Sequence, residues 1–278
     1  MRASPAAGHT PAPTLGQQTR TGTLHLAFEV RGGRTVLMRE FQKAPLMIVR
    51  PFALPCGTLS VFVVNPTGGL LGGDHNEIQI SVGPGAKALI LTQSATRVQP
   101  SATGAAATQA VHLSVACGGR LEYYPERVLP FAGSRLHQTL RVNLDSGAQL
   151  GLTETLASGR VHAGERLAFV EYRSRTEVWC GPQRLYLDVL RLTPAPQTRA
   201  PGIWQHLDYA ASGVFVGPGE IGNWPNVLGR LASGLSAGGA VWLRAAAARG
   251  PCLDADLYEA RQSLRQQLFG AQPLKIRR

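Results

Sequence analysis

A strand–turn–strand unit occurs three times in the middle of this chain. In each copy an apolar strand that alternates with polar residues leads through a four-residue turn into a second strand. Period-two alternation indicates half-buried strands, and repeated units of this kind bury one continuous core when they stack. The repeat therefore predicts a mainly β fold of stacked β-hairpins, either β-helix-like or an elongated sandwich. The copies are residues 78–92, 111–125 and 140–154, with turn glycines at Gly85, Gly118 and Gly147.

Stacking of the copies would also bring the ends of their second strands together. These ends are polar or acidic in each copy, so one edge of the stack would carry a row of polar and acidic groups. The residues are Thr92-Gln93, Pro125-Glu126 and Glu154-Thr155.

The rest of the chain divides into a leader and a single domain. Residues 1–22 are rich in Ala, Pro, Thr and Gly and contain no acid, which predicts a disordered leader. Residues 23–278 form one β-rich domain with a small helical C-terminal part, at about 226–235 and 254–269. The second helix has leucines at helical spacing, Asp254 to cap its start and Gly270 to end it. No uninterrupted apolar segment is long enough to span a membrane, so none is expected.

A glycine cluster precedes the first copy. Gly68, Gly69, Gly72 and Gly73 are followed at once by Asp74. Glycine permits positive φ and close backbone approach, so the cluster predicts a tight turn between strands. Asp-His follows the last glycine where a phosphate-binding loop requires Lys and Ser or Thr, which excludes that motif. Asp74 has two interpretations: it caps the turn by accepting backbone N–H bonds, or it contributes to a metal path.

The composition limits the partners. The net charge is +11 and the isoelectric point is near 10.3, yet no run of five basic residues appears. A nucleic-acid surface has no local support, and an acidic protein partner suits an arginine-rich chain. The four cysteines are far apart and lack metal-ligand spacing, which favours a reducing, cytoplasmic compartment.

Six acids remain near predicted loops. Carboxylates without thiolates hold a divalent ion weakly, whereas the alternative for each acid is an ion pair with one of the arginines. Arg160 and Glu165 are such a pair, suited either to a hairpin or to an interface. The six acids are Asp74, Glu77, Glu122, Glu126, Glu154 and Glu165.

Four motifs, in order, resemble one family, the urease accessory proteins UreD (also called UreH). The glycine cluster with Asp74 looks like its most characteristic segment. Residues 92–98 resemble its Thr-Gln-small-Ala-Thr-basic run, with Arg97 where Lys is usual. Residues 121–126 resemble its Leu-Glu-aromatic stretch, and 159–165 its Gly-Arg and Gly-Glu steps. The resemblance is strong from 59 to 170 and thin after 195.

The resemblance implies a non-enzymatic chaperone that binds the urease apoprotein together with UreF and UreG. Nickel would be transferred rather than retained, and GTP would enter only through UreG. The six acids would line a weak, transient nickel path. Residues for structure or interaction would be Gly68, Gly69, Gly72, Gly73, Thr92, Gln93, Arg97 and Arg160.

Two other functions remain open from the residues alone. A β-rich carbohydrate- or polymer-binding module fits the strand pattern, although the aromatic content of 6% is low for sugar platforms. A metal-dependent hydrolase would use Asp74, His75 and Glu77, whose spacing matches no established metal motif.

Overall fold

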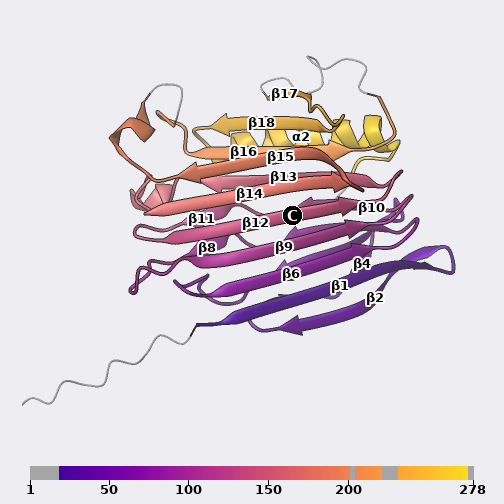
Figure 1. Ribbon diagram of the computed structural model, residues 1–278, viewed down its shortest axis with the longest axis horizontal. Coiled ribbons are helices and arrows are strands. Elements are labelled where there is room, and N and C mark those ends of the chain that lie inside the picture. The colour runs from indigo at the N-terminus through magenta and orange to yellow at the C-terminus, as the bar shows by residue number, and fades with distance from the viewer. Residues whose placement is uncertain (1–18, 201–203, 221–230, 275–278) are drawn as a thin grey trace, which may run out of the picture.

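The computed structural model describes residues 19–200, 204–220 and 231–274. Its strands form two sheets that lie face to face (Figure 1). The first sheet, in front in Figure 1, has seven strands in the order β15-β14-β12-β9-β6-β1-β2. Their bounds are Thr21–Arg31 (β1), Arg34–Lys43 (β2), His75–Val82 (β6), Ala107–Val115 (β9), Arg135–Leu144 (β12), Glu171–Cys180 (β14) and Gln183–Leu192 (β15).

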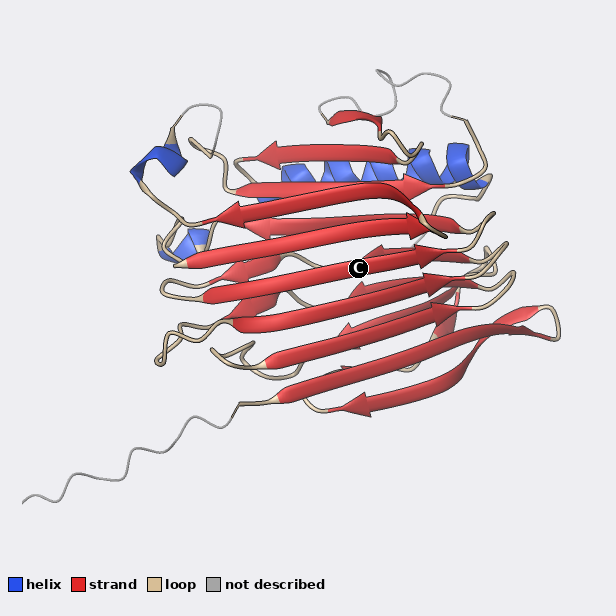
Figure 2. Ribbon diagram, viewed as in Figure 1, coloured by secondary structure: helices blue, strands red, loops and turns tan. Residues whose placement is uncertain are grey.

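The second sheet follows the path β17-β18-β16-β13-β10-β7-β5-β3, with three short strands attached beside it. The path strands are Met47–Ile48 (β3), Leu59–Val64 (β5), Lys87–Thr92 (β7), Arg120–Tyr124 (β10), Gln149–Ala157 (β13), Tyr209–Val216 (β16), Ala232–Leu235 (β17) and Val241–Ala247 (β18). The attached strands are Phe52–Ala53 (β4), Thr96–Val98 (β8) and Val128–Pro130 (β11). Two 3₁₀ turns, Val161–Ala163 (η1) and Pro196–Arg199 (η2), and the helix Gly250–Phe269 (α2) complete the described elements (Figure 2).

The predicted β-helix-like stack is confirmed, with one refinement. The two strands of a copy do not pair with each other; the turn carries the chain from one sheet to the other, and each strand pairs in parallel with its equivalents in the neighbouring copies. The three turns have the same geometry. Gly85, Gly118 and Gly147 all have positive φ (69°, 69° and 79°), a conformation that glycine adopts without steric cost.

The core lies between the sheets, and α2 covers the outer face of the second sheet (Figure 2). Alternation along each strand decides which core a side chain joins. In β10, Leu121 and Tyr123 enter the core between the sheets, whereas Tyr124 packs beneath α2. Leu253, Leu257 and the other buried leucines of α2 form the apolar face that closes this second core.

Several predicted boundaries change. Residues 1–18 of the leader lie outside the described part of the chain, and β1 already begins at Thr21. The helix predicted at 226–235 is wrong where it can be checked: 232–235 form strand β17, and 226–230 lie outside the described residues. Helix α2 starts at Gly250, because Pro251 suits its first turn, and Asp254 pairs with Arg127 instead of capping. Gly270 ends the helix in the left-handed conformation, as predicted.

Candidate functional site

A row of polar side chains crosses the inner face of the first sheet. Asn76, Gln109, Gln138 and Ser174 occupy adjacent positions on four neighbouring parallel strands. The three amides, Asn76, Gln109 and Gln138, each stand two residues before an apolar position of the same face. Asn76, for example, precedes Ile78 and Ile80, which are buried in the core between the sheets. Because the strands pair in this register, the four polar residues, one from each strand, form a continuous row across the sheet, which we call a ladder.

A second polar row faces it from the other sheet. Leu91 of β7 pairs with Tyr124 of β10, so the residues that follow them, Thr92 and Pro125, also align. Glu154 of β13 continues this row, and it pairs with Ser212 of β16. The backbone N–H of Glu126 donates to Thr92 Oγ1 at 2.8 Å. The predicted alignment of the strand ends is thus confirmed. We call the space between the two ladders the seam.

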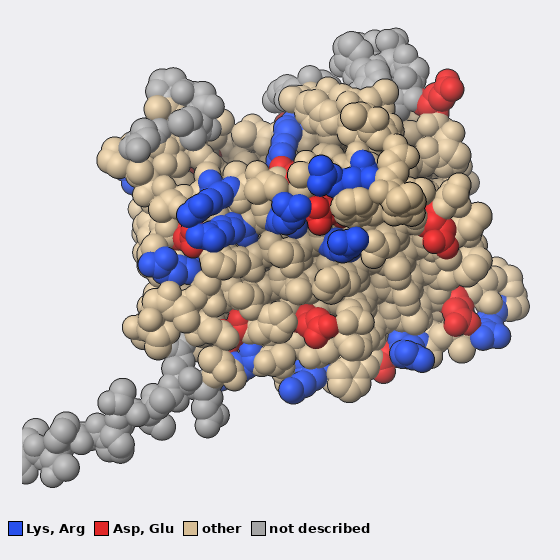
Figure 3. Space-filling view, viewed as in Figure 1, with Lys and Arg blue, Asp and Glu red and all other residues tan. Residues whose placement is uncertain are grey.

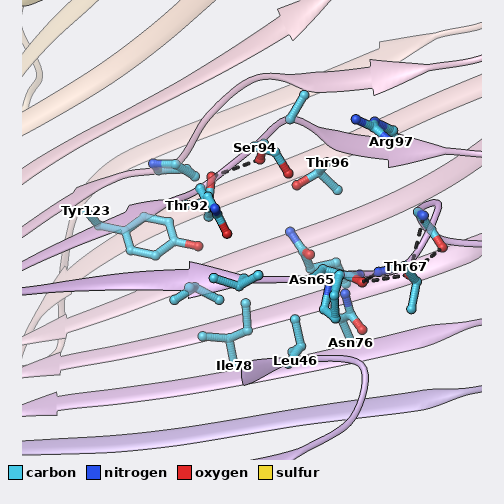
Figure 4. Close-up of a pocket in the computed structure, with 18 residues that line it drawn as sticks. Leu46, Asn65, Thr67, Asn76, Ile78, Thr92, Ser94, Thr96, Arg97 and Tyr123 are labelled. Atoms are coloured by element: carbon cyan, nitrogen blue, oxygen red, sulfur yellow. Dashed lines mark hydrogen bonds between the residues drawn. The ribbon is translucent and has the colours of Figure 1, made fainter. Parts of the chain in front are cut away.

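Three cavities follow one another along the seam. The largest, of about 400 Å³, is lined by Asn76, Thr92 and Tyr123 and by the glycine-rich turn (Figure 4). It shares Gln109 and Tyr123 with a constriction of about 20 Å³. The constriction in turn shares Glu154 with a third cavity of about 170 Å³. The seam is therefore a series of adjacent spaces, of which the smallest lies between Gln109 and Glu154.

Glu154 is the acid at the centre of the seam. Its carboxylate accepts hydrogen bonds from Gln138 Nε2 and, at 2.5 Å, from Thr176 Oγ1. Burial raises the pKa of Glu154, although these two hydrogen bonds oppose the shift. Beyond it, Asp188 and Arg244 form an ion pair that lines the third cavity. A buried carboxyl with a raised pKa binds or releases a proton more readily near neutral pH than an ordinary acid.

The glycine cluster forms the wall of the seam beside the large cavity. The chain runs so close to β8 that a Cβ at Gly69 would lie 2.4 Å from Arg97 O, and one at Gly72 would lie 2.1 Å from Ser101 Oγ. Gly69 also has a φ of 120°. Arg97, itself exposed, lies beside this turn (Figure 4). The cluster is therefore a tightly packed turn, as predicted, and Gly68 is its least crowded position.

Asp74 caps that turn. Its carboxylate accepts from Leu71 N and from Arg20 N, each at 2.9 Å, and the residue is 4% exposed. The structure thus shows the capping role. His75 and Glu77, the other two members of the hydrolase hypothesis, have separate partners, Thr108 and Gln79. The three side chains share no common centre.

Glu122 lies outside the seam, which corrects its prediction as one of six acids that line a common path. Because Tyr123 faces the seam, Glu122 faces the opposite side of the sheet, where it is fully buried beneath α2. It forms ion pairs with Arg265 of α2 and, at 3.5 Å, with Arg120. The predicted ion-pair alternative is the correct one for this acid.

The remaining predicted residues lie at the periphery. Glu165 pairs with Arg160 and accepts from Ala132 N at 3.1 Å, and the hydrogen bond from Arg160 lowers the pKa of Glu165. The guanidinium of Arg160 also lies over Phe131, 4.4 Å from the ring centre. Glu77 is on the outer side of the first sheet, Gln93 is exposed, and Glu126 reaches the edge of the seam. Of the six predicted acids, the structure brings only Glu154 and Glu126 to the seam.

Sequence reasoning missed the first-sheet ladder. The signal was present, since each copy carries Asn or Gln two residues before its first apolar position. Among the residues that the structure describes, no three His, Cys, Asp or Glu side chains gather closely enough to hold a metal ion. In the same part of the chain, no helix combines the length and apolar character needed to cross a bilayer.

Comparison with known proteins gives one consistent result. The family model for the UreD urease accessory protein matches residues 20–278. A protein named urease accessory protein UreD from Deinococcus radiodurans is 58% identical, over 95% of this chain and 97% of its own length. Another from Anaeromyxobacter is 33% identical over 80% of this chain and 76% of its own. A third, UreD 1 from Synechococcus, is 36% identical over 69% and 72%.

Proposed function

The chain belongs to the UreD family of urease accessory proteins, and we propose that within urease maturation it passes Ni²⁺ along the seam toward the urease apoprotein. The observation that carries this proposal is the series of adjacent cavities in which the constriction and the third cavity share the partly buried carboxyl of Glu154. The chain acts here as a non-catalytic chaperone, and nickel is its cargo.

The donors along the seam suit a transferred ion. They are mainly amide and hydroxyl oxygens, with the carboxylate of Glu154 at the centre, and two buried amide oxygens, Asn76 Oδ1 and Gln138 Oε1, have no hydrogen-bond partner. Such oxygens bind Ni²⁺ more weakly than imidazole or thiolate does. A path must hold its ion weakly at several points, because a tight site would prevent release.

Glu154 couples passage to a proton. Its raised pKa favours the protonated form, which leaves the buried carboxyl neutral and avoids the cost of an unpaired charge. Metal ligands must be deprotonated, so an arriving Ni²⁺ displaces the proton from Glu154. The proton returns when the ion moves on.

The outer face of the first sheet supports a protein partner. Arginines gather over β12, β14 and β15 (Figure 3), and Glu171 and Glu177 only partly neutralise them. A basic face of this kind steers and orients an acidic partner. We assign the partners as the urease apoprotein, UreF and UreG, with GTP bound by UreG. The exposed arginines are Arg141, Arg173, Arg175, Arg184 and Arg191.

The test compares an acid inside the seam with one outside it. The chain is co-expressed with urease, UreF and UreG, and the nickel content of purified urease is measured by elemental mass spectrometry. Glu154→Gln should lower the nickel content several-fold while the variant still co-purifies with its partners. Glu77→Gln, on the outer face, should leave it unchanged. Normal nickel loading with Glu154→Gln would refute the seam as the path.

A second variant tests the constriction. Gln109→Phe places a larger side chain at the narrowest part of the seam, where only about 20 Å³ is open. Nickel loading should fall in this variant as well. His112→Phe adds the same ring to the exposed side of the same strand and is the matched control. Equal loading of both variants would mean that the ion takes another route.

A further inference from the structure

A cationic cluster lies beneath α2, on the side of the second sheet away from the seam. Cys56 stands in the turn between β4 and β5, partly exposed, and Arg265 Nη2 donates to its Sγ at 3.3 Å. Arg265 is 0% exposed and Arg120 is 5% exposed. Both guanidinium groups therefore lose their hydration here and need compensating negative charge.

The hydroxyl of Thr58 fixes the hydrogen-bond pattern around the sulfur. Thr58 Oγ1 accepts from Arg120 Nη2 at 3.3 Å and from Arg265 Nη2 at 3.5 Å. The Cys56 thiol donates to the same oxygen at 3.5 Å. Once the thiol is ionised, the sulfur accepts from Arg265 Nη2, and the Thr58 hydroxyl can turn its own proton toward it.

The charges of the cluster do not balance without the sulfur. Arg120 and Arg265 contribute two positive charges, and Glu122 contributes the single carboxylate. Tyr124 stays neutral because burial raises the pKa of its hydroxyl. The buried Nε of Arg120 lies 3.5 Å from Glu122 Oε1 but makes no hydrogen bond. One further negative charge would neutralise the group, and the Cys56 sulfur is the ionisable atom that both guanidinium groups approach.

We propose that Cys56 is a stabilised thiolate and a site of reversible oxidation by peroxides. The thiolate sulfur attacks one oxygen of hydrogen peroxide, the S–O bond forms as the O–O bond breaks, and hydroxide leaves. Sulfur is oxidised by two electrons to the sulfenic acid and the peroxide is reduced.

The balance of effects on the sulfur agrees with this assignment. Burial raises the pKa of the Cys56 thiol, but the hydrogen bonds from Thr58 and the charges of Arg265 and Arg120 together outweigh it, so the pKa is lowered. Cys117 and Cys252 are more exposed than Cys56 and serve as internal references. If access alone decided reactivity, those two would react first.

The first experiment measures alkylation rates in the full chain. Iodoacetamide is added between pH 5.5 and 9, and mass spectrometry of the peptides follows each cysteine separately. At pH 6.5 the Cys56 peptide should be alkylated about tenfold faster than those of Cys117 and Cys252, because the thiolate is the nucleophile. A Cys56 rate equal to or below theirs across the range would overturn the proposal.

Two variants change the charge environment in opposite directions. Thr58→Val removes the hydroxyl donor at nearly constant volume and should move the pH midpoint of Cys56 alkylation upward. Glu122→Gln removes the negative charge and should move it downward. Matching shifts support the charge argument, and the absence of both shifts contradicts it.

The peroxide step has its own readout. The native protein is treated with hydrogen peroxide in the presence of dimedone, which traps sulfenic acids. Dimedone should label Cys56, and the amount of label should fall in Thr58→Val. A thiol reductant that is added after the peroxide but before dimedone should abolish the label, because it reduces the sulfenic acid. Equal trapping at Cys56, Cys117 and Cys252 would show that Cys56 has no special reactivity.

Discussion

Glu122 is the acid whose replacement should most destabilise the protein. It is fully buried, and its Oε1 faces Arg265 on one side and Arg120 Nε, 3.5 Å away, on the other. At an effective dielectric of about 20, a pair at that distance attracts with about 5 kcal/mol. Glu122→Gln removes this attraction but leaves both guanidinium groups buried. Removing one member of a buried ion pair costs about 3–5 kcal/mol, and we expect a loss in that range.

The assay is urea unfolding followed by far-UV circular dichroism. The matched control is Glu177→Gln, because Glu177 pairs with Arg175, whose side chain is 48% exposed, and surface pairs contribute at most about 1 kcal/mol. The double variant Glu122→Gln/Arg265→Gln should lose less stability than the sum of the two single variants, since it removes one of the unpaired charges. A loss below about 1 kcal/mol for Glu122→Gln, equal to the control, would refute the reasoning.

Three further outcomes follow from particular contacts. Gly72→Ala should destabilise the fold by about 1–3 kcal/mol, because the added Cβ would overpack against Ser101. Gly68→Ala is the control and should cost far less, because the nearest atom to its added Cβ would lie 3.8 Å away. Thermal melts compare the two variants. Because the folded-state pKa of Glu154 is raised, its contribution to stability is full below the ordinary carboxyl pKa and is lost as pH rises through the raised value; Glu154→Gln should remove that part of the pH dependence of Tm. Arg160→Met should change Tm little, because its pair with Glu165 is exposed.

The sequence was most informative about the stack. Alternation and the repeated turn glycines specify strands and their spacing, and Gly85, Gly118 and Gly147 indeed form equivalent turns. Which strands pair with each other was harder to predict. A strand–turn–strand unit has the same sequence pattern whether its two strands pair with each other or lie in different sheets on either side of a core. Only the register between copies distinguishes the two arrangements.

The site was predicted in part. Glu154 and Thr92 were placed correctly because the ends of the second strands align. Glu122 was placed incorrectly, although side-chain alternation beside Tyr123 contains the signal. Its partner Arg265 comes from a helix far along the chain, and no local pattern links the two.

Under the proposed function, the partly buried carboxyl of Glu154 at the centre of the seam would set how an ion moves through it. Burial raises the pKa of Glu154 and so favours its neutral, protonated form, which lowers the cost of holding the carboxyl there. Asp188 and Arg244 at the far end pair with each other, and their charges act in opposite directions on the pKa of Glu154: Asp188 raises it and Arg244 lowers it. A divalent ion that reaches Glu154 therefore gains one negative charge and the neutral oxygens of Gln138 and Thr176, too few ligands to retain it. On this proposal, onward transfer needs only a receiving site with stronger nitrogen or carboxylate ligands, so the acceptor rather than an energy source within this chain would determine its direction.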